Sequence, residues 1–101
     1  MSNRFDHTQI NEIIHSRIRL SILAVLSTVD EIEFISLMKE VNTTKGNLSV
    51  HLSKLETEGY VNIKKQFVGK KPLTTCKISE NGLSALKEYL DMVEELAKLT
   101  K

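Results

Sequence analysis

Short hydrogen-bonding side chains lie along one side of a predicted helix that spans about residues 45–58. On a helical wheel Leu52 and Leu55 fall within about 40° of Leu48, which predicts a buried side. The other side carries small or mildly polar residues: Gly46, Asn47, Ser49, Val50 and Ser53. An amide, two hydroxyls and a pair of methyl groups at this spacing offer hydrogen bonds and close apolar contact.

These groups match the chemistry of base edges in a DNA groove. Asn47 can pair with adenine, Ser49 can bond several bases, and the methyls of Val50 can touch a thymine methyl. Gly46 lets the backbone approach a phosphate, at a helix N-terminus whose amides favour an anion. The alternative is a solvated helix surface, which leaves unexplained a glycine that costs about 1 kcal/mol relative to alanine. We therefore expect this helix to dock in the major groove, which is about 12 Å wide.

Basic residues concentrate in the middle of the chain. The net charge of all 101 residues is only +1, but residues 45–79 carry seven basic and two acidic groups, a net charge of +5. Residues 1–44 and residues 80–101 each carry a net charge of −2. A basic segment between acidic flanks favours a polyanionic partner.

Four of these basic groups fall in or near a predicted β-hairpin: Lys64, Lys65, Lys70 and Lys71. Phosphate contacts from such groups would position the protein without selecting a sequence. For Lys64 and Lys65, protection of an edge strand is a second role consistent with their place. For Lys70 and Lys71 we favour contact with DNA.

The first half of the chain is predicted to be mainly helical. A short helix covers about residues 6–14, and Ser16 can cap a second helix that follows it. "EIEF" alternates and predicts a very short strand, after which a helix of about residues 35–41 leads to the turn "NTT". Thr44 can then cap the helix of residues 45–58, and Gly59 supplies its left-handed stop.

The second half predicts a β-hairpin and a final helix. Period-two alternation in "YVNIKKQFV" and "LTTCKIS", joined by "GKKP", predicts a wing over about residues 60–78. Ser79 can cap a helix of about residues 80–99. The predicted fold is therefore a single domain over residues 1–101, mainly α with a small β-hairpin (α+β): a winged helix-turn-helix with a C-terminal dimerisation helix.

Three segments together resemble the winged helix-turn-helix transcriptional regulators of the MarR/ArsR-like group. They are "GNLSVHLSKLETEGYV", "KKQFVGKKPLTTCKISENG" and a leucine-rich final helix, and the resemblance spans about residues 16–99. It implies a homodimer that docks two helices in successive major grooves of a pseudo-palindromic operator in double-stranded DNA. The implied recognition helix contributes Thr44, Lys45, Gly46, Asn47, Ser49, Val50, Ser53 and Lys54. The implied wing contributes Lys64, Lys65, Gly69, Lys70 and Lys71.

The final helix has apolar residues on two sides. One set is expected to cover the domain's own core: Leu83, Leu86, Leu90, Val93 and Ala97. The other set then needs a partner, most commonly a twofold-related copy: Tyr89, Met92, Leu96 and Leu99, with Phe5, Ile10 and Ile13 of the first helix helping.

Other classes of function find little support in the sequence. Cys76 alternates into the predicted core side of its strand, and His7, His15 and His51 lack ligand spacing, so neither a metal site nor a cofactor is expected. Phe67 is expected to pack rather than to stack on bases. No catalytic pair, apolar signal segment or membrane span is evident, which predicts a cytoplasmic protein that is not an enzyme.

A second hypothesis keeps the fold and changes the partner. In it, the same face of the winged helix binds another protein without reading DNA. A protein-binding face is expected to bury large aromatic or apolar anchors, whereas this face offers Val50 and little else. The basic loop also fits DNA better than a protein surface. The nature of any small-molecule effector is left open.

Overall fold

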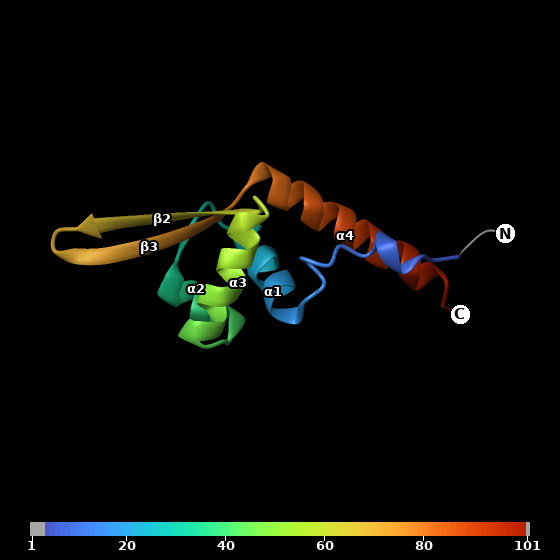
Figure 1. Ribbon diagram of the computed structural model, residues 1–101, viewed down its shortest axis with the longest axis horizontal. Helices are drawn as coiled ribbons and strands as arrows, with labels where there is room; N and C mark the ends of the chain where they lie inside the picture. Colours follow the sequence, from blue (N-terminus) through green and yellow to red (C-terminus); the bar gives the residue numbers. More distant parts are fainter. Residues whose placement is uncertain (1–3, 101) are drawn as a thin grey trace.

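The computed structural model describes residues 4–100 as an elongated α+β domain of 62 × 23 × 21 Å (Figure 1). Four α-helices, one 3₁₀ turn and three strands follow one another along the described chain. In order they are η1 (His7–Gln9), α1 (Arg17–Leu26), β1 (Ile32–Glu33), α2 (Phe34–Val41), α3 (Lys45–Thr57), β2 (Val61–Val68), β3 (Lys71–Ile78) and α4 (Glu80–Lys98). The predicted fold class, a winged helix-turn-helix with a C-terminal helix, is confirmed. Figure 1 shows the β2–β3 hairpin and α4 extending in opposite directions from the block formed by α1, α2 and α3.

Side-chain caps start the three longest helices where the sequence predicts them. The hydroxyls of Ser16, Thr44 and Ser79 accept hydrogen bonds from backbone amides in the first turns of α1, α3 and α4. Asn42 ends α2 in the left-handed conformation, at φ 59°, and turns the chain sharply into α3. Gly59, at φ +81°, ends α3 in the same region. The α2–turn–α3 unit is therefore held by local chemistry at both ends.

The three strands form one antiparallel sheet in the order β1-β3-β2. On the face that covers the core, Cys76 of β3 lies between Ile32 of β1 and Ile63 of β2. The connection is shorter than expected from "GKKP", because Val68 pairs with Lys71 and leaves only Gly69 and Lys70 in the turn. Gly69 has φ +66°, as the first position of a two-residue hairpin turn of type II′ requires.

The helix predicted for residues 6–14 is wrong beyond its first turn. The carboxylate of Asp6 caps η1, and Ile10 then adopts an extended conformation. The side-chain oxygen of Asn11 next accepts hydrogen bonds from the amides of Ile13 and Ile14. Because these side chains satisfy the backbone amides locally, they compete with a continuous helix.

One core joins all the helices to the base of the hairpin. Its fully or almost fully buried residues come from the N-terminal segment, the helices and the two long strands: Ile14, Ile22, Leu23, Leu26, Leu37, Leu48, Leu52, Leu55, Val61, Cys76, Leu86 and Tyr89. The three leucines predicted on the inner side of α3 are all among them. This packing sets the orientation of α3, whose opposite side faces solvent.

The division of α4 into a core side and a partner side is corrected by the structure. Tyr89, expected to face a partner, is 7% exposed and belongs to the core, and Met92 is half-buried against it. Leu90 and Val93, expected in the core, are 50% and 40% exposed. The apolar surface of α4 is instead one broad face. At about 1.5 Å per residue the helix is too long for its own domain, so the apolar face continues beyond the core.

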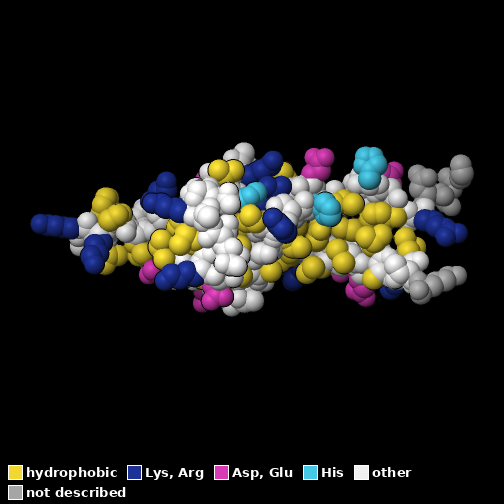
Figure 2. Space-filling view, turned by 90° about the horizontal axis from the view of Figure 1, so that it is seen from below, with side chains coloured by type: hydrophobic (Ala, Val, Ile, Leu, Met, Phe, Trp, Pro, Cys, Tyr) yellow, Lys and Arg dark blue, Asp and Glu magenta, His cyan; other side chains and the backbone are white. Residues whose placement is uncertain are grey.

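Ile10 and Ile13 are also partly buried against the domain's own core. The N-terminal segment lies along the C-terminal half of α4 (Figure 1). Figure 2 shows hydrophobic side chains gathered over this end of the molecule. The exposed part of the surface consists of Leu90, Val93, Leu96 and Leu99, which we call the α4 apolar strip.

Candidate nucleic-acid interface

The outward side of α3 carries the small polar residues that the sequence singles out. Asn47, Ser49 and Ser53 are exposed, and so is Val50. A Cβ placed on Gly46 would meet nothing within 4 Å, so no neighbouring atom of the domain requires a glycine there. The first turn of α3 therefore carries no side chain at Gly46 on its solvent-facing side.

A hollow flanks the N-terminal end of α3 on the side of α1. It has a volume of about 490 Å³. Its lining comes from the start of α1, the α2–α3 turn and the first turn of α3: Arg17, Ile18, Ser21, Val41, Asn42, Thr43, Thr44 and Asn47. Arg17 is exposed and brings a cation beside Thr44 and Asn47, two predicted contacts.

A second hollow of about 250 Å³ flanks α3 on the side of the wing. Lys45, Ser49 and Ser53 of α3 form one wall, and Ile63, Lys65 and Thr74 of the hairpin form the other, with Phe34 and Leu52 at its base. The hollow therefore brings a wing lysine to the same side of the molecule as the outward residues of α3. The predicted recognition helix thus lies between two hollows, each with a cationic side chain in its lining.

The wing lysines do not share one face of the hairpin. Side chains alternate across a strand, so Lys65 lies on the same face as Ile63, toward α3, whereas Lys64 lies on the opposite face. There Lys64 lines a different hollow, together with Glu31 and Lys77. Lys70 occupies the exposed turn, and Lys71, paired with Val68, follows it.

Positive charge on this side is not neutralised within the domain. Between residues 4 and 100, the one ion pair within 4 Å joins Lys98 to Glu95 on α4. The first turns of α1 and α3 also contain no acidic residue, and they begin with Arg17 and Lys45. A cation at a helix N-terminus is unfavourable by about 0.3–1 kcal/mol. A bound phosphate would be attracted both by this cation and by the amides of the helix N-terminus. This pattern could have drawn attention to Arg17, which the sequence reasoning missed.

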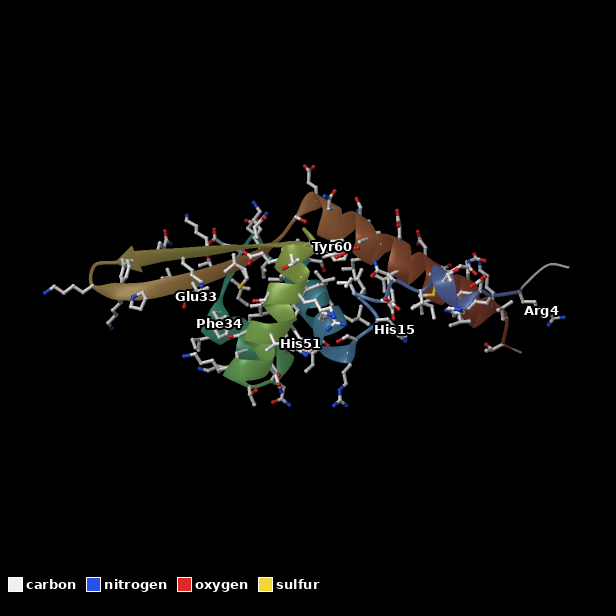
Figure 3. The ribbon with its side chains drawn as sticks, viewed as in Figure 1. Arg4, His15, Glu33, Phe34, His51 and Tyr60 are labelled. Carbon is white, nitrogen blue, oxygen red and sulfur yellow. The ribbon has the colours of Figure 1, made fainter. Side chains whose placement is uncertain are left out.

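Arg19 joins the N-terminal segment to α3. Its guanidinium donates to the carbonyl oxygen of Ile13, and its Nη1 lies 3.0 Å from Nδ1 of His51. Figure 3 labels His51 on α3. Arginine is only a donor, so His51 must accept at Nδ1 and carry its proton on Nε2. Partial burial, followed by the charges of Arg19 and Lys54, lowers the pKa of His51. His51 therefore packs at the junction between α1 and α3.

Two further contacts fasten the N-terminal segment. The side-chain amide nitrogen of Asn11, Nδ2, donates to the hydroxyl oxygen of Tyr60, and 2.9 Å separates the two atoms. Nδ1 of His15 lies 2.9 Å from the hydroxyl of Tyr89. With the Arg19 link, these contacts connect the segment to α3, the base of the hairpin and α4.

The remaining predictions for single residues have different outcomes. Cys76 is fully buried as expected, and its burial, with a smaller effect of Glu56, raises the thiol pKa to about 11. Phe67 was expected to pack, but it is exposed near the tip of the hairpin, beyond the reach of the core. None of the helices described between residues 4 and 100 has the length and apolar character needed to cross a membrane.

Comparison with known proteins supports this description. A family described as the winged helix DNA-binding domain matches residues 18–97. An uncharacterized protein of Methanocaldococcus jannaschii is 38% identical over 87 residues, which cover 86% of this chain and 95% of the relative.

Two solved structures illustrate the similarity of the fold. A transcriptional regulator homologue from Pyrococcus horikoshii superposes with a TM-score of 0.81 at 26% identity, covering 87% of each chain. A MarR-family transcriptional regulator from Silicibacter pomeroyi has a TM-score of 0.66 at 18% identity and covers 86% of this chain and 58% of its own. The second likeness concerns the fold alone.

Proposed function

Because the chain belongs to the family of winged helix DNA-binding domains, we propose that it regulates transcription as a homodimer bound to a pseudo-palindromic operator. In this proposal α3 occupies the major groove of double-stranded DNA. The observation that carries the proposal is the position of the small polar side of α3 between the two hollows lined by Arg17 and by Lys45 and Lys65.

The chemistry of this face divides into two kinds of contact. Asn47, Ser49 and Val50 can meet base edges, because they are short and project from the exposed side of α3. Arg17 and Lys65 flank the helix on either side, where the phosphate rows of a major groove would lie. Base contacts would select the sequence, and phosphate contacts would supply salt-dependent affinity.

The homodimer is supported by the α4 apolar strip. Leu90, Val93, Leu96 and Leu99 leave apolar surface exposed on a helix that extends past its own core. An exposed contiguous apolar surface on a small domain marks an interaction site, and a second copy in a twofold arrangement is the commonest partner. Two copies paired through α4 would carry two copies of α3, as a pseudo-palindromic site requires.

Selection of bound fragments from a pool of random duplex DNA tests the proposal. A homodimer should enrich two inverted half-sites whose centres are about 34–36 Å apart, or about one helical turn. Sedimentation at micromolar concentration should give a dimer for the wild type and a monomer for Leu96→Glu. Ser84→Glu, on the exposed polar side of the same helix, is the matched control and should remain a dimer.

Two results would count against the proposal. Absence of any enriched duplex would contradict DNA recognition and favour the protein-binding alternative. A wild-type monomer, or a dimer that Leu96→Glu leaves intact, would contradict dimerisation through α4.

A further inference from the structure

Phe67 is a large apolar side chain that the fold leaves in solvent. Its exposed fraction is 74%, and the residue opposite it in the hairpin is Pro72. Burial of such a side chain normally stabilises a folded protein, and this domain does not gain that stabilisation. The exposed ring is therefore available to a partner.

We propose that Phe67 and Pro72 form an apolar wedge that the wing places in the minor groove beside the major groove occupied by α3. The inference rests on the proposed DNA-binding function and adds a sequence-selecting residue to it. In this role the wedge favours DNA in which the base steps that flank the half-site are easily deformed.

The surroundings of the wedge favour a polyanion with an apolar interior. From residue 59 to residue 79 the chain has five lysines and no aspartate or glutamate. A minor groove presents sugars and base edges between two rows of phosphates, so it can meet an apolar knob and a cationic border together. A protein partner for the same surface would need an acidic border around an apolar pocket.

The geometry places the wedge on the correct side and at a suitable distance. Phe67 shares a face of β2 with Ile63 and Lys65, and those two residues line the hollow beside α3. Four residues of strand span about 13 Å, so Phe67 lies about that far beyond Ile63. Adjacent major and minor grooves are separated by about half a helical turn, or roughly 17 Å. The wing tip can thus reach the neighbouring minor groove while α3 stays in the major groove.

Deformability supplies the selectivity. An apolar wedge in the minor groove partly unstacks a base step, and this deformation costs free energy. Pyrimidine–purine steps such as TA and CA/TG are the easiest to unstack. Operators bound by this protein should therefore contain such steps where the wings touch, outside the bases read by α3.

The test compares Phe67→Ala with Val68→Ala. Val68 is also exposed, at 61%, but its side chain lies on the opposite face of the hairpin, so it is the matched control. Phe67→Leu keeps an apolar side chain. Each variant is titrated on the duplex selected by the wild type across a range of salt concentrations, and each is used in a fresh selection from random duplex DNA.

We expect Phe67→Ala to bind about tenfold more weakly for each engaged wing, or about 1.4 kcal/mol at 25 °C. Its salt dependence should stay that of the wild type, because no charge is removed. Its selected fragments should keep the half-sites and lose the preference for flexible flanking steps. Phe67→Leu should fall between the wild type and Phe67→Ala, and Val68→Ala should behave as the wild type.

The outcomes separate this inference from the function on which it rests. If the wild type selects an operator but Phe67→Ala matches Val68→Ala in affinity and in flanking sequence, the wedge is refuted while DNA recognition stands. The exposed ring would then be a candidate contact for an acidic protein. If the wild type selects no duplex, both the wedge and the proposed function fail.

Discussion

Two adjacent lysines of β2 offer a test of docking geometry with its own internal control. Lys65 lines the hollow beside α3 together with Lys45, whereas Lys64 lies on the other face of the hairpin with Glu31 and Lys77. The two substitutions to alanine remove the same charge from neighbouring positions of one strand. If α3 and the inner face of the wing meet DNA, only Lys65→Ala should remove a phosphate contact.

The magnitude follows from counterion release. Each phosphate contact contributes about 0.9 to the slope of log affinity against log salt concentration. In a homodimer, Lys65→Ala removes two contacts and should reduce the slope by about 1.8. An increase from 50 to 200 mM salt should therefore weaken binding by the wild type about tenfold more than it weakens binding by the variant. Lys64→Ala should leave the slope close to that of the wild type.

The assay is a salt titration of the wild type and both variants on the selected operator and on scrambled DNA. Phosphate contacts carry no sequence information, so the effect of Lys65→Ala should appear on both duplexes. Equal slopes for Lys64→Ala and Lys65→Ala, or a larger effect of Lys64→Ala, would refute the orientation of the wing proposed here.

Three further predictions concern the stability and chemistry of the domain. Gly82→Ala should lower the free energy of unfolding, measured in urea, by about 1–3 kcal/mol, because the new Cβ would lie 2.1 Å from the backbone carbonyl oxygen of Tyr60. An unchanged free energy of unfolding would contradict this close packing. The thiol of Cys76, with its pKa raised to about 11, should react with iodoacetamide far more slowly in the native protein than in urea, and equal rates would contradict its burial. Because the pKa of His51 is lowered in the folded protein, the unfolded state binds more protons just below pH 6.5, and the free energy of unfolding should fall as the pH falls through that window. Urea unfolding should show a weaker fall for His51→Gln than for the wild type. Identical pH profiles would contradict the lowered pKa of His51.

Helix α3 could be predicted from sequence because its determinants are local. The spacing of Leu48, Leu52 and Leu55 specifies the buried side, and Thr44 and Gly59 mark the two ends. Period-two alternation along the hairpin strands likewise predicted that Cys76 is buried, as it is in the structure. The same alternation also places Lys64 and Lys65 on opposite faces of the hairpin.

The incorrect predictions for α4 and for Phe67 concern exposure, which depends on how far the core extends along each element. Helical periodicity shows that α4 is apolar on a broad face, but not that the core stops near Tyr89 and Met92. Val93 and Leu96 continue that face beyond the core and are exposed for this reason. Phe67 is exposed for a similar reason, because the hairpin carries it past the last residue it could pack against.

Competition between local and helical hydrogen bonds explains the N-terminal segment. Ile10, Ile13 and Ile14 have helical spacing, yet Asp6 and Asn11 use their side chains to satisfy nearby amides. The segment is instead held by long-range contacts, of which the hydrogen bond from Asn11 to Tyr60 is one. Such contacts join residues far apart in the sequence and have no periodic signature.

The most direct test of the central claim is the effect of Asn47→Ala on discrimination between DNA sequences. Asn47 is exposed on α3 and lines the hollow that also contains Arg17. Binding to the selected operator and to scrambled DNA is measured side by side at one salt concentration. Loss of one bidentate base contact should remove about 1–3 kcal/mol of discrimination per half-site and leave scrambled DNA almost unaffected. An equal loss on both duplexes, or no loss on either, would contradict sequence reading by α3.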